Sequence, residues 1–323
     1  MTNTRNYRRG VKASNQILGA AAGLLLDRVL GEPSTRYHPV ALFGRLAGGI
    51  EPHFWEDTRR SGGYFWTSLL IPIWILGELF EGSFIATAVS SYLAIAEKSL
   101  FEAAGSVHSS LALPDLDLAR SELLSLVGRD RSHLEEDDIA RATVESVAEN
   151  SVDAVVGVLF WGSLLGAKGA LAYRSINTLD SMFGNFSDRY SNFGWTSAKL
   201  DDVANFIPAR LTTLMISLLS RTDLGTLRRT FRQARPHPSP NAGLVEAAYA
   251  EALGIELGGE LSYQGVGEFR PLVGKLGNDV VSEDIRQAVS LARKVDSVFV
   301  TALLLLGVSI RCFAYFKGLG EEG

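Results

Sequence analysis

The sequence predicts a mainly α-helical, polytopic integral membrane protein with polar cytoplasmic helices and loops. Three observations predict this fold class. Strand-like alternation of apolar and polar residues is nearly absent from the 323 residues, and several long stretches carry almost no charge. Lysines and arginines flank those stretches, which is typical of the cytoplasmic ends of membrane helices. A hydrophobic fraction of 46% also excludes a disordered chain.

The first apolar stretch follows a basic N-terminus. Arg5, Arg8, Arg9 and Lys12 precede the uncharged run 13–26. This arrangement superficially resembles a secretory signal, but the small residues lie inside the run and leave too short a stretch before any cleavage point. We therefore expect a retained helix with a cytoplasmic N-terminus.

The stretch 61–96 has only Glu78 and Glu81 as charges, and Gly77 and Gly82 predict a break between two helices there. No stretch reaches the roughly 18 uninterrupted apolar residues that identify a spanning helix. Buried helices of a large soluble protein are therefore the alternative interpretation. The expected apolar helices lie near residues 13–30, 61–77, 82–97, 152–173, 203–220 and 295–316.

Polar segments separate these helices. We expect them at 114–149, 174–210 and 221–294. The Gly-rich part 254–278 predicts an irregular segment or a hairpin, and a helix is expected to begin near Ser282. These expectations together describe one membrane-integrated domain over residues 1–323.

Composition excludes several classes of function. Lys plus Arg number 31 and Asp plus Glu 36, giving a net charge of −5, so no nucleic-acid partner is expected. The single cysteine, Cys312, excludes an internal disulfide and a cysteine-built zinc site. The sequence has no P-loop, Rossmann glycine, zinc-protease or serine-hydrolase motif, so any nucleotide is bound by other means.

Three carboxylates share the spacing of one helix face. Glu145, Glu149 and Asp153 lie at i, i+4 and i+8, with Asn150 beside them. Like charges at this spacing destabilise a helix by about 0.2–0.5 kcal/mol per pair, so we expect a compensating cation. Mg²⁺ fits, because it typically uses one or two carboxylates plus substrate phosphates. A solvated helix face, with Arg141 partly neutralising the first glutamate, is the alternative.

Two further polar groups adjoin apolar helices. Arg174 and Asn177 lie at i and i+3, and a guanidinium fork suits phosphate or carboxylate. The pair Asp201 and Asp202 precedes Asn205 and is a candidate cation site. Helix capping and interface anchoring are the alternatives for both groups.

Two His-Pro pairs complete the candidates. His38 and His237 each precede a proline, which favours extended backbone, so we expect both in loops. A histidine held on a stiff loop suits a phosphate contact or proton transfer. Asn241 is expected to cap a helix that begins near Leu244. Simple exposure of both histidines is the alternative.

Five sequence blocks occur in one order along the chain. They are Asp27 with Gly31-Glu32-Pro33 and His38-Pro39-Val40; Glu145 to Asp153; Tyr173-Arg174 to Met182; Asp201-Asp202 to Arg210; and His237-Pro238-Ser239-Pro240-Asn241-Ala242-Gly243. Together they resemble the adenosylcobinamide-phosphate synthase family of cobalamin biosynthesis.

The resemblance implies a multi-pass protein of the cell membrane that contacts membrane lipid. It implies an ATP- and Mg²⁺-dependent ligase that joins adenosylcobyric acid to aminopropanol phosphate, or to aminopropanol, through an amide. It also implies a corrinoid substrate and, as possible partners, other cobalamin-assembly enzymes.

Roles within the shared motifs are assigned as a hypothesis. The catalytic candidates are Glu145, Glu149, Asn150, Asp153, Asp180, His38 and His237. Substrate- or phosphate-binding candidates are Arg174, Asn177, Lys199, Asn205, Arg210, Ser239 and Asn241. Candidate Mg²⁺ ligands are Glu149, Asp153, Asp201 and Asp202. His38 or one carboxylate would take the proton of the amine.

Two other functions stay open. A non-enzymatic polytopic transporter or assembly partner for corrinoids explains carboxylates in apolar surroundings equally well. It explains the long polar segments with His-Pro loops and paired aspartates less well. A membrane phosphotransferase with paired aspartates is the third option, although the acidic motifs lack its expected D-G-x2-A-R spacing.

Overall fold

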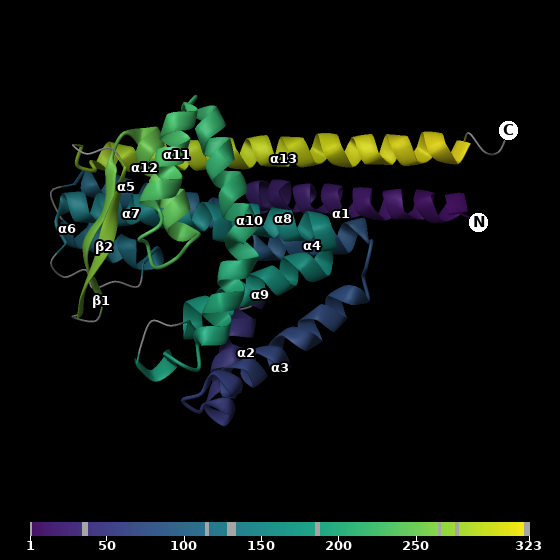
Figure 1. The fold of residues 1–323 in the computed structure, drawn as a ribbon, viewed down its shortest axis with the longest axis horizontal. Coiled ribbons are helices and arrows are strands. Elements are labelled where there is room, and N and C mark those ends of the chain that lie inside the picture. The colour runs from purple at the N-terminus through teal and green to yellow at the C-terminus, as the bar shows by residue number, and fades with distance from the viewer. Residues whose placement is uncertain are drawn as a thin grey trace. The chain divides into compact units, whose positions relative to one another are not determined.

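The fold is that of a computed structural model, which describes residues 2–33, 38–113, 116–127, 134–184, 188–263, 266–274 and 278–319. Over these residues the chain is almost entirely helical, with one two-stranded antiparallel sheet (Figure 1). The first helices are α1 (Thr2–Leu30), α2 (Pro39–Phe54), α3 (Arg59–Glu78), α4 (Phe84–Ala94), α5 (Glu97–Leu111), α6 (Leu116–Glu122), η1 (Leu123–Ser125) and α7 (Glu136–Ser151). The remaining elements are the π-helix η2 (Val152–Val156), α8 (Gly157–Leu165), α9 (Ala167–Phe183), η3 (Asp188–Tyr190), α10 (Trp195–Leu219), α11 (Leu224–Gln233), α12 (Ala242–Leu253), β1 (Glu256–Tyr263), β2 (Val266–Gly274) and α13 (Ser282–Leu319).

Two compact units divide the chain. Unit 1 comprises Met1–Ala96, Asp153–Ala204 and Phe299–Gly323. Unit 2 comprises Glu97–Val152 and Asn205–Val298. The sequence analysis expects one domain over residues 1–323, and that expectation stays a prediction. Each unit is described by itself below.

Small residues allow the helices of unit 1 to pack closely. A Cβ on Gly23 of α1 would lie 2.5 Å from the Cβ of Ser91 in α4, so the two backbones meet only because this side chain is missing. Figure 1 shows α1 alongside the C-terminal part of α13. There Ser14 donates a hydrogen bond to the carbonyl of Gly307 at 2.8 Å. The core behind α1 joins α4, η2, α8 and α9.

Aromatic rings fill a second core in unit 1, where α2, α3 and α9 meet. The ring of Phe65 lies 5.1 Å from that of Phe183 and 5.2 Å from that of Phe193. Gly62 packs directly under this cluster, because a Cβ there would lie 1.9 Å from the carbonyl oxygen of Phe193. This core fixes α9, which carries several of the candidate site residues.

Unit 2 contains the β1–β2 hairpin, which packs against α12, α11 and α7. The predicted hairpin in 254–278 is confirmed. A register shift lies between Leu257 and Gly259, where Gly258 (φ 94°) and Gly259 (φ 97°) adopt backbone conformations that other residues rarely reach. The helix before the hairpin ends at Gly254 in the left-handed region, as a C-terminal glycine favours.

Several predicted boundaries are confirmed, and one predicted helix is divided. The break between α3 and α4 and the start of α13 at Ser282 lie where expected. The expected helix 152–173 is instead a π-helix followed by α8, which ends before Gly166. Gly166 has φ 69°, and a Cβ there would lie 3.1 Å from Gln16, so the chain turns at this position. Pro208 lies inside α10, which continues to Leu219.

Two helical stretches are long and apolar enough to cross a membrane, Phe84–Leu111 and Ser282–Lys317. Both overlap helices that the sequence predicts as apolar. Core helices of soluble proteins have the same length and composition, so the two stretches are weak evidence for a membrane location. The most apolar 18 residues of the second stretch are only 22% buried, and Leu305 and Phe313 are among the exposed apolar side chains of that stretch.

Gly62→Ala tests the close approach in the aromatic core. We expect it to destabilise the protein by about 1–3 kcal/mol or more, because the new methyl group would displace the backbone at Phe193. Thermal unfolding of the purified protein measures this loss. Gly49→Ala is the matched control within helix α2, since a Cβ there meets nothing within 4 Å. Equal stability of the two variants would contradict the packing.

Candidate functional site

The two units each contain a group of sequence-predicted residues. In unit 1, an asparagine on α9 lies between two carboxylates. Asn177 donates from Nδ2 to Oδ2 of Asp153 at 2.9 Å and reaches Oδ1 of Asp201 at 3.5 Å. The three residues come from η2, α9 and α10, and from three different sequence blocks. The structure thus brings together two predicted Mg²⁺ ligands and one predicted substrate-binding residue.

A π-helical turn places Asp153. The α-helical pattern of α7 stops at Ser151, and η2 inserts a wider turn before α8 begins. The regular i, i+4, i+8 face predicted for the three carboxylates therefore ends before Asp153. Such π-turns occur frequently at functional sites, because the extra residue redirects a side chain.

The same asparagine also contacts the arginine one turn earlier. Arg174 donates from Nη1 to Oδ1 of Asn177 at 3.4 Å, as the i, i+3 spacing predicts. The Nε atom of Arg174 is buried and has no hydrogen-bond partner among the described residues. Asp180 is half-buried one turn further along α9. On α10, Lys199 donates to Asp202 at 2.7 Å, so that carboxylate is paired within its own helix.

His38 is the N-cap of α2 and is confirmed to lie outside a helix. Val40 donates its backbone N–H to Nδ1 of His38 at 3.3 Å, and Pro39 occupies the first helical position. The side chain is 6% exposed, and Nε2 has no hydrogen-bond partner among the described residues. Burial lowers the pKa of His38; Glu32 opposes this shift and Arg174 adds to it.

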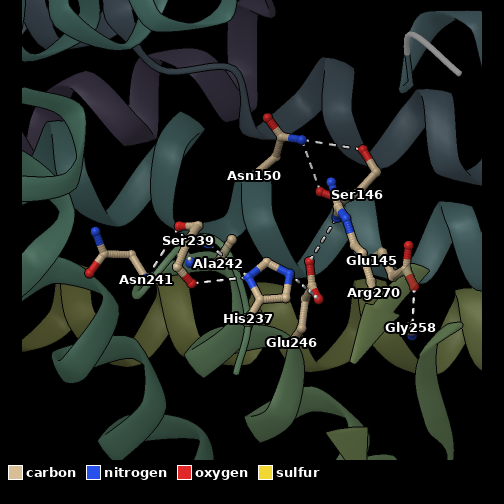
Figure 2. A network of polar contacts seen from close by, with 10 residues as sticks. All are labelled: Glu145, Ser146, Asn150, His237, Ser239, Asn241, Ala242, Glu246, Gly258 and Arg270. Carbon is tan, nitrogen blue, oxygen red and sulfur yellow. Dashed lines mark hydrogen bonds and ion pairs between the residues drawn. The ribbon is translucent and has the colours of Figure 1, made fainter. Parts of the chain in front are cut away.

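Unit 2 holds a second buried polar network (Figure 2). His237 places Nε2 3.5 Å from Oε2 of Glu246, and Arg270 of β2 places Nη1 3.6 Å from the other oxygen of this carboxylate. Glu246 is 1% exposed. Sequence reasoning missed both Glu246 and Arg270 as network members, since no local spacing links a helix residue to a strand 24 positions later.

The His237 loop is built against the start of α12. A Cβ on Gly243 would lie 2.3 Å from the Cβ of His237, so this glycine makes room for the imidazole. Ser239 accepts hydrogen bonds at Oγ from the backbone N–H groups of Ala242 (3.1 Å) and Asn241 (3.3 Å). The predicted side-chain cap by Asn241 is therefore wrong: Asn241 occupies the N-cap position, but Ser239 supplies the capping oxygen.

Asn241 instead uses its side chain to hold an arginine. Arg210 donates from Nη1 to Oδ1 of Asn241 at 2.8 Å and to the carbonyl of Phe206 at 2.8 Å. Asn205 directly precedes Phe206 on α10 and is buried. Four of the predicted phosphate-binding residues, Asn205, Arg210, Ser239 and Asn241, thus lie in unit 2.

The acidic residues of α7 have different surroundings. Glu145 is 1% exposed and accepts the backbone N–H of Gly258 at 2.9 Å, which ties α7 to the hairpin. Glu149 is exposed, and Asn150 donates to the carbonyl of Ser146 at 2.9 Å. Arg141 pairs with Asp138, not with Glu145.

A magnesium ion needs oxygen ligands, and Asp153 with Asp201 offers carboxylates directed at one amide. Within the part of the chain that the structure describes, no three His, Cys, Asp or Glu side chains gather in an arrangement able to hold a metal. Two carboxylates are nevertheless enough for Mg²⁺ when substrate phosphates complete its shell. The residues present therefore fit an ion that arrives with a phosphorylated substrate.

Comparison with known proteins gives one consistent result. The family model described as CobD/Cbib protein matches residues 20–292. The Cobalamin biosynthesis protein CobD of Chromobacterium violaceum is 42% identical over 312 residues, covering 92% of this chain and 97% of that protein. The proteins of the same name from Stutzerimonas stutzeri and Mycobacterium tuberculosis are 41% and 40% identical, over 90% and 87% of this chain and 97% and 92% of their own length. No solved structure matches the chain.

Substitutions at Glu145 separate a structural role from a catalytic one. Glu145→Gln keeps an acceptor for the N–H of Gly258, so we expect nearly unchanged stability and activity. Glu145→Ala leaves that buried N–H unpaired and should cost about 1–3 kcal/mol in the free energy of unfolding. Loss of activity in the glutamine variant at unchanged stability would assign Glu145 to catalysis instead.

The lowered pKa of His38 predicts how stability depends on pH. The unfolded chain binds the proton near the ordinary pKa of 6.5, whereas the folded chain resists protonation until a lower pH. The contribution of His38 is therefore complete above pH 6.5 and is lost as pH falls from 6.5 through the lowered pKa. His38→Asn keeps an N-cap and removes this titration. Thermal unfolding at a series of pH values should show a shallower acid-side decline in the variant; identical curves would contradict the shift.

Proposed function

The chain belongs to the CobD/CbiB family of cobalamin biosynthesis proteins, and from this premise we propose that it is an ATP-dependent amide ligase. Its substrates are adenosylcobyric acid and (R)-1-aminopropan-2-ol O-phosphate, or the free aminopropanol. The products are adenosylcobinamide phosphate or adenosylcobinamide. The protein acts as a multi-pass protein of the cell membrane with a cytoplasmic N-terminus, in contact with membrane lipid, where the large corrinoid docks against apolar helix surface.

The observation that carries this proposal is the cluster in unit 1. Asp153, Asn177 and Asp201 bring two carboxylates to one amide, and Arg174 adds a fixed cation beside them. A ligase that uses ATP must hold polyphosphate, a divalent cation and an anionic acyl group together. Carboxylates and a guanidinium within one partly buried cluster meet these requirements.

A carboxylate is a poor acyl donor, so it needs activation before an amine can attack it. In the proposed reaction, an oxygen of the corrinoid propionate attacks the terminal phosphorus of ATP, and ADP leaves. The neutral amine then attacks the carbonyl carbon of the acyl phosphate, and inorganic phosphate leaves. The proton lost by the amine nitrogen passes to a carboxylate of the cluster.

Four residues of the unit 1 cluster and its neighbour Lys199 would have separate roles in this reaction. Mg²⁺, held by Asp153 and Asp201, would neutralise phosphate charge when bound. Asn177 keeps both carboxylates in place, and Arg174 binds phosphoryl or acyl oxygens. Lys199 lies on the same helix as Asp201, and its pairing with Asp202 keeps its ammonium near that end of the cluster.

A direct assay on the full chain in detergent tests the activity. We expect the amide product, identified by mass spectrometry, only when adenosylcobyric acid, an amine acceptor, ATP and Mg²⁺ are all present. Asp153→Asn and Asp201→Asn should each lower turnover by about 100-fold or more, because each removes a charge from the cluster. Asp137→Asn, an exposed change of the same kind on α7, is the control. Corrinoid binding without any ATP-dependent product would favour transport or assembly.

A further inference from the structure

Two buried nitrogen atoms, at the start of α2 and on α9, have no acceptor among the described residues. They are Nε2 of His38 and Nε of Arg174; Nε1 of Trp66 on α3 is a third such atom in unit 1. The helix that His38 caps, α2, packs against α9, with Gly44 facing Met182 and Thr178, and the charge of Arg174 acts on His38. Buried donors in native proteins are nearly always paired, so an unpaired one calls for an explanation, and a missing ligand is a common one. Two such donors in one neighbourhood strengthen that explanation.

The hydrogen-bonding state of His38 follows from its cap. Nδ1 accepts the backbone N–H of Val40 at 3.3 Å, so its lone pair is occupied. In neutral imidazole one nitrogen accepts and the other donates, which places the proton on Nε2. His38 therefore presents an N–H at Nε2, and this atom is unable to accept a proton from an amine. In this arrangement the proton of the amine passes to a carboxylate, the other acceptor that the sequence analysis names.

Arg174 offers its other edge in a fixed orientation. Its Nη1 is engaged by Oδ1 of Asn177, so the orientation of the guanidinium is set by the same amide that orients Asp153. The Nε edge remains for a ligand. A guanidinium is always charged, so the expected partner is an anion with planar or tetrahedral oxygens.

We propose that the N–H groups at Nε2 of His38 and Nε of Arg174 form a subsite for a phosphoryl oxyanion, in which His38 is a neutral donor. The identity of the anion rests on the proposed ligase function: it is the terminal phosphate of the nucleotide or the phosphate ester of the amino alcohol. A phosphoryl group is favoured over a carboxylate because Asp153 and Asp201 lie on the other side of Asn177. Carboxylates in pairs hold Mg²⁺ together with phosphate oxygens.

Substitutions at position 38 distinguish the donor from the cap. His38→Asn retains an oxygen able to cap α2 and removes the donor at Nε2. His38→Gln places an amide N–H near the position of Nε2, provides no base and weakens the cap. The probes are ATP, aminopropanol phosphate and acetate, titrated separately by calorimetry into the full chain in detergent. Acetate tests whether the subsite binds a carboxylate. ATP and aminopropanol phosphate distinguish the two sources of a phosphoryl group.

We expect one or both phosphate compounds to bind the wild-type chain, and acetate not to bind. His38→Asn and Arg174→Gln should each weaken that binding about tenfold or more, since a hydrogen bond to a charged group is lost. His38→Gln should bind the phosphate compound more tightly than His38→Asn, because it restores an N–H near the position of Nε2. Arg286→Gln, an exposed arginine on α13, is the control with unchanged binding.

Three results would overturn the subsite. The first is unchanged phosphate binding in His38→Asn, and the second is binding of acetate but of neither phosphate compound. The third is loss of turnover in His38→Gln at intact phosphate binding, which would identify His38 as a base. Phosphate binding that responds to the variants as expected, with no amide formed, would retain the subsite and remove the proposed ligase function. Thermal unfolding of each variant shows whether lost binding reflects a lost fold.

Discussion

The amide of Asn177 is the interaction on which the rest of the unit 1 cluster depends. Its nitrogen faces Asp153 and Asp201, and its oxygen accepts from Arg174. Two carboxylates directed at one point repel each other, and that repulsion grows as water is excluded. An amide dipole oriented by a guanidinium on its far side offsets part of it. One side chain therefore ties three elements together and determines which way two acids point.

Packing between α8 and α9 keeps this arrangement in register. Asn177 contacts Asp153, and one helical turn away Tyr173 contacts Gly157. Tyr173 lies four residues before Asn177 and Gly157 four residues after Asp153, so the two contacts are neighbours between the same two segments. A Cβ on Gly157 would lie 2.1 Å from the phenol oxygen of Tyr173, whose side chain is 1% exposed. Because Gly157 has no side chain, the Tyr173 ring packs directly against its backbone. The close contact between Gly157 and Tyr173 thus sets the distance at which Asp153 and Asn177 meet. The π-turn of η2 directs the Asp153 carboxylate toward Asn177.

Local signals in the sequence predicted much of the fold. Glycines marked the break between α3 and α4 and the hairpin, and the helix expected from Ser282 is α13. Arg174 and Asn177 could be paired because three residues of helix separate them. The partner of Glu145 could not be foreseen, because Gly258 lies 113 positions away and donates only a backbone N–H. The π-turn could not be foreseen either, since its residues, 152–156, carry no local signal for it.

The polar networks of the two units connect different groups. In unit 2, Glu246 lies between His237 and Arg270, and Glu145 holds the hairpin through Gly258. These side chains come from the His237 loop, α7, α12 and the hairpin, so the network joins those elements and fixes the loop and the hairpin. In unit 1, His38 and Arg174 each bury a donor for which the described chain supplies no acceptor. A buried donor without an acceptor costs stability unless a ligand supplies the missing oxygen, so we expect the chemistry of the protein at that pair and at the carboxylates beside it.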